Sequence, residues 1–102
     1  MEIHVHSPHA ANDENGIEGT IARSLERFSE RLTRVEVFLQ DVNGEKGGVD
    51  RQCTLEARPR GLDPLAASHQ AATAREALSG AVSKLERVLD ARFGRLDRHH
   101  RG

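Results

Sequence analysis

Hydrophobic and polar residues alternate at the start of the chain. Within residues 2–6, Ile3 and Val5 are separated by histidines, a period of two that predicts a half-buried strand with both apolar side chains inward. A Ser-Pro pair ends this strand. Residues 10–16 are mostly polar and are predicted to form a loop.

The period then changes to that of a helix. Apolar residues three or four positions apart share one helical face, and they predict a first helix from about Glu18 to Leu32. This apolar face consists of Ile17, Ile21, Leu25, Phe28 and Leu32.

Three further strands are predicted after this helix. Residues 35–40 and 52–58 alternate with a period of two, and the turn-forming residues 43–48 between them indicate a hairpin. After a turn at residues 59–61, a weaker alternation predicts a fourth strand over residues 65–69.

A long amphipathic helix is predicted from about Ala74 to Arg98. Thr73 and Glu76 have the spacing of a capping box, in which the Thr side chain caps the first turn and the Glu reaches back to the N–H of the cap. The apolar stripe of this helix consists of Leu78, Val82, Leu85, Leu89, Phe93 and Leu96.

The predicted order β-α-β-β-β-α defines an α+β fold. A four-stranded sheet with two helices packed on one face buries the apolar stripe of each helix. We expect one α+β domain over residues 1–98 and a short basic tail over residues 99–102. The expected core consists of Ile3, Val5, Ile21, Leu25, Phe28, Val35, Val37, Leu39, Leu55, Leu78, Val82, Leu85 and Leu89.

Composition narrows the class of protein. Fifteen Lys and Arg against sixteen Asp and Glu give a net charge of −1, which excludes a uniformly basic nucleic-acid binder. No apolar run approaches the roughly 20 residues that cross a bilayer, and no secretory signal is present. With three Phe and neither Tyr nor Trp, we expect no aromatic platform for single-stranded bases. These features indicate a soluble cytoplasmic domain without a membrane partner.

Charges are segregated along both predicted helices. At ~100° per residue, the basic residues of each helix fall on one flank of its apolar stripe and the acidic residues on the other. Basic ridges are the usual electrostatic footprint of a protein that binds a phosphate backbone. The alternative is that each basic flank is solvated, or pairs with the acidic flank of its neighbour. The candidate RNA-binding residues are Arg23, Arg27, Arg31, Lys84, Arg87, Arg95 and Arg98.

Three short segments, taken with the element order, resemble a known family. Residues 31–39 resemble its junction between first helix and strand, and Leu25-Glu26 stands where many members have Leu-Glu. Residues 82–89 are similar to its lysine-leucine-x-arginine signature in the last helix. The sequence thus resembles the ribosome hibernation-promoting factors, also known as ribosome-associated inhibitors or sigma-factor modulation proteins.

This resemblance implies a function and a partner. Members bind the small ribosomal subunit under stress or in stationary phase, where basic residues of both helices contact rRNA and the protein blocks the mRNA and tRNA sites. The resemblance implies no cofactor and no small-molecule substrate. Lys84 and Arg87 match the family's basic positions directly, and Arg31 matches at the end of the first helix. The other four candidates join them only through helical spacing.

The sequence also departs from the family. Thr73-Ala74-Arg75 replaces the family's acidic-methionine-tyrosine start to the second helix. The long members carry a C-terminal dimerisation domain, whereas this chain ends soon after the second helix, so we expect no dedicated dimerisation domain.

Other chemistry is weakly represented. His4 and His6 share a strand face with His9 nearby, but without a Cys or Asp cluster beside them we predict no metal site. Cys53 lies on the inward side of its strand and is interpreted as a core residue. No nucleophile, base and oxyanion donor come together, so the chain is not predicted to be an enzyme.

The rival function is a protein-interaction module that docks a stress or transcription factor through its helices. Salt dependence separates the two hypotheses. Binding through several phosphates weakens steeply as salt rises, whereas docking on an apolar helix surface responds little.

Overall fold

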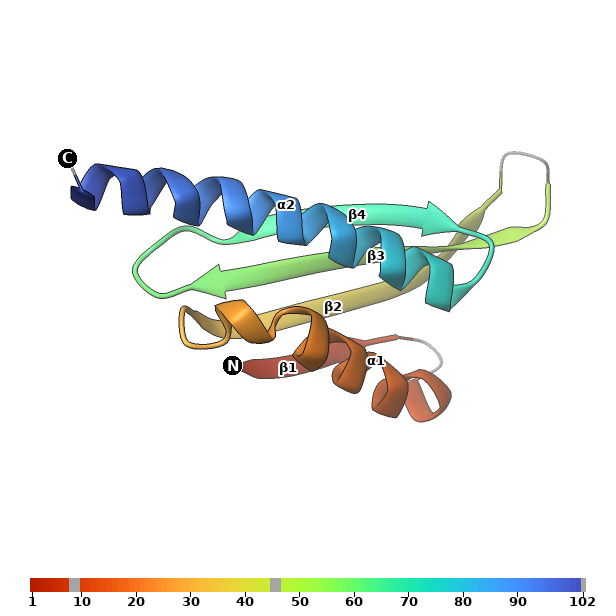
Figure 1. The fold of residues 1–102 in the computed structure, drawn as a ribbon. Coiled ribbons are helices and arrows are strands. Elements are labelled where there is room, and N and C mark those ends of the chain that lie inside the picture. Colours follow the sequence, from red (N-terminus) through yellow and green to blue (C-terminus); the bar gives the residue numbers. More distant parts are fainter. Residues whose placement is uncertain (8–9, 45–46, 102) are drawn as a thin grey trace.

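The protein folds as a four-stranded sheet with two helices on one face (Figure 1). The computed structural model describes the backbone of residues 1–7, 10–44 and 47–101, and the side chains of residues 1–7, 16–44 and 47–96. The elements in chain order are β1 (Glu2–His6), α1 (Ala10–Ser24), the 3-10 turn η1 (Glu26–Phe28), β2 (Leu32–Asn43), β3 (Val49–Pro59), β4 (Leu65–Ala71) and α2 (Ala74–Arg101). The predicted α+β class and element order are confirmed.

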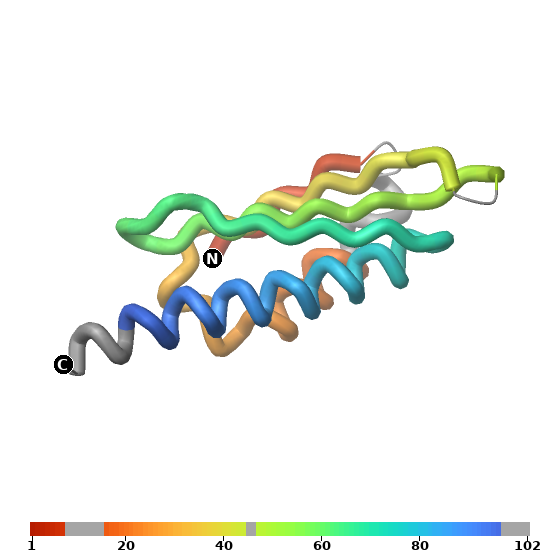
Figure 2. The backbone as a smooth tube through the Cα atoms, turned by 90° about the horizontal axis from the view of Figure 1, so that it is seen from above, coloured from red at the N-terminus to blue at the C-terminus, as the bar shows by residue number. Residues whose placement is uncertain are grey.

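The strands lie side by side in the order β1-β2-β3-β4. β1 runs parallel to β2, because a helix connects them as a crossover, and the other neighbours are antiparallel hairpins. Seen from above, α1 and α2 lie on the same side of the sheet (Figure 2). No described element covers the opposite side, which we call the open face.

The core lies between the sheet and the helices. All predicted core residues of the helices, β2 and β3 are buried, whereas Ile3 and Val5 are partly buried because β1 is an edge strand. The prediction that Cys53 faces the core is confirmed. The buried set is Ile17, Ile21, Leu25, Phe28, Leu32, Val35, Val37, Leu39, Cys53, Leu55, Ala57, Ala77, Leu78, Ala81, Val82, Leu85, Leu89 and Phe93.

The first helix begins earlier than predicted. Residues 10–16 are helical and the expected loop there is wrong. Ala10 and Ala11 are strong helix formers, so backbone propensity starts the helix here. Hydrophobic periodicity does not detect such a start, because the segment contains no large apolar residue.

The first helix also ends earlier than predicted, at Ser24 instead of Leu32. The chain tightens into η1, where the N–H of Phe28 donates to the carbonyl of Leu25 at 2.9 Å. Leu25 and Phe28 remain buried, and Leu32 is buried as the first residue of β2. A 3-10 turn places residues three positions apart on one side just as a helix does, so the burial prediction is right although the backbone prediction is wrong.

The predicted turns are confirmed where glycine supplies an unusual backbone angle. Gly47 and Gly48, in the hairpin between β2 and β3, have φ of 83° and 76°. Gly61, in the turn after Pro59, has φ of 72°. Only glycine adopts this left-handed region without steric cost.

The second helix begins where the capping pattern predicts. The hydroxyl of Thr73 accepts a hydrogen bond from the N–H of Glu76 at 3.2 Å, which confirms the Thr73 half of the capping box. The backbone remains helical to Arg101, slightly past the predicted end. The C-terminal end of α2 projects beyond the sheet (Figure 1).

Candidate nucleic-acid interface

Three predicted RNA-binding residues lie on one side of α2. Lys84, Arg87 and Arg95 are all exposed. The ammonium group of Lys84 donates to the carbonyl of Ser68 in β4 at 3.0 Å, which shows that this side of the helix faces the β4 edge of the sheet. At ~100° per residue, Arg95 shares the side of Lys84, and Arg87 stands on the crest opposite the core. We call these three residues the α2 basic side.

Two members of the α2 basic side have no carboxylate partner among the side chains that the structure describes. Among the residues whose side chains are described, Arg87 and Arg95 form no ion pair. Their guanidinium groups are therefore available to an external anion without first breaking a contact within the described part of the chain.

Arg27 is engaged within the protein. Its guanidinium donates two hydrogen bonds to the carboxylate of Asp90 in α2, at 2.5 and 2.8 Å, and lies 4.1 Å from the ring centre of Phe28. The bidentate bond raises the pKa of Arg27 and lowers the pKa of Asp90. For this residue the structure matches the alternative expectation, in which a basic flank pairs with the acidic flank of the neighbouring helix.

Arg23, Arg27 and Arg31 do not form one continuous helical flank, because the helix ends at Ser24. Arg23 remains exposed on α1. Arg31 lies in the turn before β2, half-buried, with its guanidinium carbon 3.9 Å from the ring centre of Phe93. Arg27 and Arg31 thus line the side of α2 that carries Asp90. Lys84 and Arg95 face away from them, and Arg87 stands on the crest between the two sides.

The end of α2 carries more predicted basic residues. The backbone of Arg98 is helical, but its side chain lies outside the described residues, as do those of His99 and His100. Arg92, which precedes Arg95 by one helical turn and was not among the candidates, is half-buried.

The open face has an order that periodicity does not predict. The strand register aligns outward side chains in rows across the sheet, since directly opposite residues share a face. In strand order the four rows are Glu2-Arg34-Arg58, then His4-Glu36-Glu56-Ala66, then His6-Phe38-Thr54-Ser68, then Gln40-Gln52-Gln70. A basic and an acidic row therefore lie beside an aromatic row and an amide row.

The aromatic row corrects an expectation from composition. The rings of His6 and Phe38 stack with centres 4.8 Å apart and planes 12° apart, and Phe38 is 39% exposed. Composition provides few aromatic residues, but it does not reveal that strand pairing places a histidine ring against one of them. A small aromatic platform is therefore present on the open face.

A buried carboxylate fixes the histidine of this platform. The imidazole of His6 donates from Nε2 to Glu36 at 2.6 Å, and Arg34 donates to the same carboxylate at 3.0 Å. The hydrogen bond from His6, aided by the positive charge of Arg34, lowers the pKa of Glu36 despite its burial.

This lowered pKa predicts an acid-sensitive contribution to stability. A carboxyl group whose pKa is lower in the folded state stabilises the fold above its ordinary pKa, and the contribution is lost as pH falls through the folded pKa. Between about pH 5 and about pH 2, the urea-unfolding free energy should fall less steeply for Glu36→Gln than for the unaltered protein. Glu26→Gln, at an exposed carboxylate, is the control. Equal slopes of unfolding free energy against pH for Glu36→Gln and the unaltered protein would contradict a lowered pKa of Glu36.

The described histidine, cysteine and acidic residues form neither a metal site nor a reactive thiol site. Among the described residues, no group of three or more His, Cys, Asp or Glu side chains is placed to hold a metal ion, and His9 lies outside them. Burial raises the pKa of the Cys53 thiol to about 12, which keeps it protonated and unreactive at neutral pH.

The fold and the α2 basic side define a small α+β domain with exposed cations on its longest helix. Over residues 3–97 the sequence matches the family described as Sigma 54 modulation protein / S30EA ribosomal protein. The match spans nearly the whole chain, and the chain belongs to this family of ribosome-associated factors, which act in ribosome hibernation and translation regulation. The family is not known as an enzyme family. No curated protein gives a significant match.

One further observation concerns membranes. Among the described residues, no helix has the length and hydrophobicity that crossing a membrane requires.

Proposed function

We propose that this protein is a hibernation factor that binds the small ribosomal subunit through rRNA and blocks its mRNA and tRNA sites under stress or in stationary phase. Family membership over residues 3–97 supports ribosome association. The observation that carries the rRNA contact is the exposure of Arg87 and Arg95 on one side of α2, with no ion pair among the described side chains. A ribosomal partner places its action in the cytoplasm.

The α2 basic side suits a phosphate backbone rather than a base sequence. Guanidinium groups bind phosphate oxygens bidentately, and such contacts position a protein on RNA without reading sequence. Arg87 and Arg95 are two helical turns apart, roughly 12 Å at 1.5 Å per residue, so they reach different phosphates of one strand. Inhibition then follows from occupancy of the channel and requires no chemical step.

The other predicted residues differ in how readily they can contact a phosphate. Lys84 reaches a phosphate only by leaving the carbonyl of Ser68, and Arg27 only by leaving Asp90. Arg23 on α1 and Arg31 beside Phe93 contact a second RNA segment. We propose residues 1–98 as the ribosome-binding domain, with Arg98 and the basic tail at 99–102 extending the contact beyond the sheet.

The proposal predicts a specific change in salt dependence. Arg87→Gln combined with Arg95→Gln should move the protein from the ribosomal to the soluble fraction in co-sedimentation. It should also flatten the slope of log affinity against log salt by about two units, one per lost phosphate contact. The matched control is Arg60→Gln with Arg75→Gln, which removes two exposed positive charges outside both proposed contacts and should keep the original slope.

The same experiment tests the rival function. If the Arg87/Arg95 variant co-sediments like the unaltered protein with an unchanged slope, the α2 basic side is only a solvated surface. Binding that is insensitive to salt throughout would favour docking to a protein partner.

A further inference from the structure

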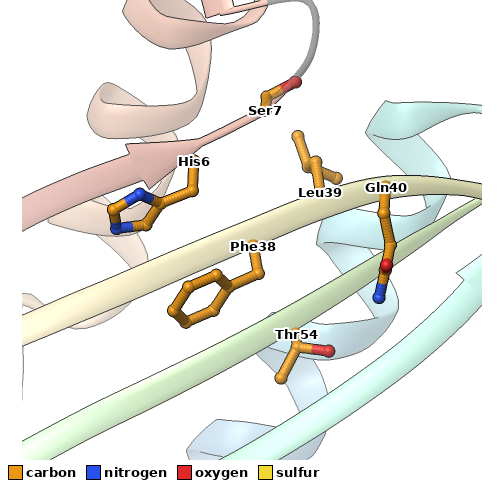
Figure 3. Close-up of a pocket in the computed structure, with 6 residues that line it drawn as sticks. All are labelled: His6, Ser7, Phe38, Leu39, Gln40 and Thr54. Atoms are coloured by element: carbon orange, nitrogen blue, oxygen red, sulfur yellow. The ribbon is translucent and has the colours of Figure 1, made fainter.

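The open face contains a hollow next to the exposed phenyl ring. It is lined by His6, Ser7, Phe38, Leu39, Gln40 and Thr54 and has a volume of about 450 Å³. Figure 3 shows His6 and Phe38 side by side, with Thr54 and Gln40 on the far side of the phenyl ring. The hollow is thus bounded by one aromatic wall, by Leu39 and by polar side chains.

The two faces of the phenyl ring have different surroundings. His6 from β1 stacks against one face. In register on β3 stands Thr54, which is too small to cover a ring and whose hydroxyl lies 2.7 Å from that of Ser68. His6 is itself oriented by its hydrogen bond to Glu36, which supports the stacked arrangement from the side of β1. A ring that is covered on one face and accessible on the other offers a surface for stacking a planar group.

The polar groups of the hollow identify the kind of planar group. Two residues along the strands, roughly 7 Å away, the amides of Gln40 and Gln52 form the next row. Amide side chains pair with the donor and acceptor edges of bases. The two amides pair weakly with each other, Nε2 of Gln40 donating to Oε1 of Gln52 at 3.5 Å, and each keeps further donor and acceptor capacity. A phenyl or indole ring of a partner protein has at most one polar atom and would desolvate this remaining capacity without pairing it, which is costly.

The charges around the hollow are compatible with a nucleic-acid strand. None of the lining residues carries a carboxylate. The row beside the hollow contains two carboxylates, and each has a basic partner. Glu36 binds both His6 and Arg34, and Glu56 binds Arg58 at 3.0 Å, so their negative charges are balanced. A phosphodiester is therefore not repelled at this surface.

We propose that the open face is a second RNA contact, in which one unpaired nucleobase stacks on Phe38 and places its polar edge against Gln40, Gln52 and Thr54. The choice of an RNA base as the ligand rests on the proposed function, in which the protein binds rRNA. The site itself is independent of the α2 basic side, because it lies on the other face of the sheet.

An NMR titration with tetraadenylate tests this proposal without ribosomes. The backbone amides of Phe38, Gln40 and Thr54 should shift with tetraadenylate and not with an abasic tetramer that carries the same phosphates. Phe38→Leu should weaken the affinity about 5- to 150-fold, the range for loss of one stacked base. Phe38→Tyr keeps the ring and should bind like the unaltered protein.

The controls separate this proposal from the preceding one. Arg87→Gln with Arg95→Gln should keep the tetraadenylate shifts on the open face, and Phe38→Leu should keep the salt slope of ribosome binding. Equal shifts with the abasic tetramer, or full affinity in Phe38→Leu, would overturn the nucleobase site while leaving the α2 contact standing. A Trp-containing peptide that shifts these amides where tetraadenylate does not would assign the hollow to a protein partner instead.

Discussion

Replacement of Leu85 by alanine is expected to lower the free energy of unfolding by about 2–5 kcal/mol. Leu85 is completely buried in the middle of α2, where it packs within the cluster between helix and sheet. Alanine removes apolar contacts and leaves a cavity that the surrounding sheet can fill only in part. Urea unfolding followed by far-UV circular dichroism measures the loss.

Val49→Ala is the control for this measurement. Val49 is 67% exposed at the hairpin, so its truncation should change stability by less than about 0.5 kcal/mol. A similarly small change for Leu85→Ala would mean that α2 is wrongly placed on the sheet. The α2 basic side would then be wrongly placed as well, since Leu85 and Lys84 are neighbours on the same helix.

The sequence predicts the core well because burial imposes a period on it. Val35, Val37 and Leu39 must all face inward for β2 to contribute to the core, and the same holds for the stripe of α2. Both elements were identified from spacing alone. Thr73 gave the start of α2 because a cap requires a specific hydrogen-bonding side chain at that position.

The first helix was predicted poorly because its two ends depend on different physics. Ala10 and Ala11 begin it through backbone propensity, which leaves no apolar pattern. After its end at Ser24 the chain tightens into η1, and Leu32 then pairs with Pro59 of β3 as the first residue of β2, so the last apolar residues of the stripe are buried outside the helix. Helical spacing does not distinguish a continuing helix from a 3-10 turn that buries the same Phe28.

The candidate interface residues come from helical spacing, which does not show how they are arranged as a surface. Helical spacing puts Lys84 and Arg95 on one side of α2. The neighbour that faces each side depends on how the helices and the sheet pack. In the structure Arg27 hydrogen-bonds to Asp90, and Lys84 hydrogen-bonds to the carbonyl of Ser68. The stacked pair on the open face was missed because it depends on strand register, and no local pattern fixes which residue of β1 lies opposite Phe38.

A glycine in α2 controls how closely this helix approaches the sheet. Gly80 faces the imidazole of His69, which lies in β4 on the inward side, in register with Cys53. A Cβ atom at position 80 would overlap the His69 ring, whereas one at Gly94 of the same helix would meet nothing within 4 Å. The two glycines therefore form a matched pair with opposite expected effects.

Gly80→Ala is expected to lower the unfolding free energy by about 1–3 kcal/mol, because the overlap forces α2 or His69 to move. Gly94→Ala should raise it by about 0.5–1 kcal/mol, the gain in helix propensity with no steric cost. Urea unfolding of both variants measures the difference in sign.

The cause can be isolated with a third substitution. In a His69→Ala background the overlap is absent, so adding Gly80→Ala should be neutral or stabilising, and the double-mutant cycle should show strong coupling between the two sites. If Gly80→Ala destabilises equally in both backgrounds, the imidazole is not the obstacle.

Because Lys84 stands one helical turn after Gly80, an outward shift of α2 should also separate its ammonium group from Ser68. Gly80→Ala should then alter the NMR signals of β4 around Ser68, and Gly94→Ala should leave them unchanged.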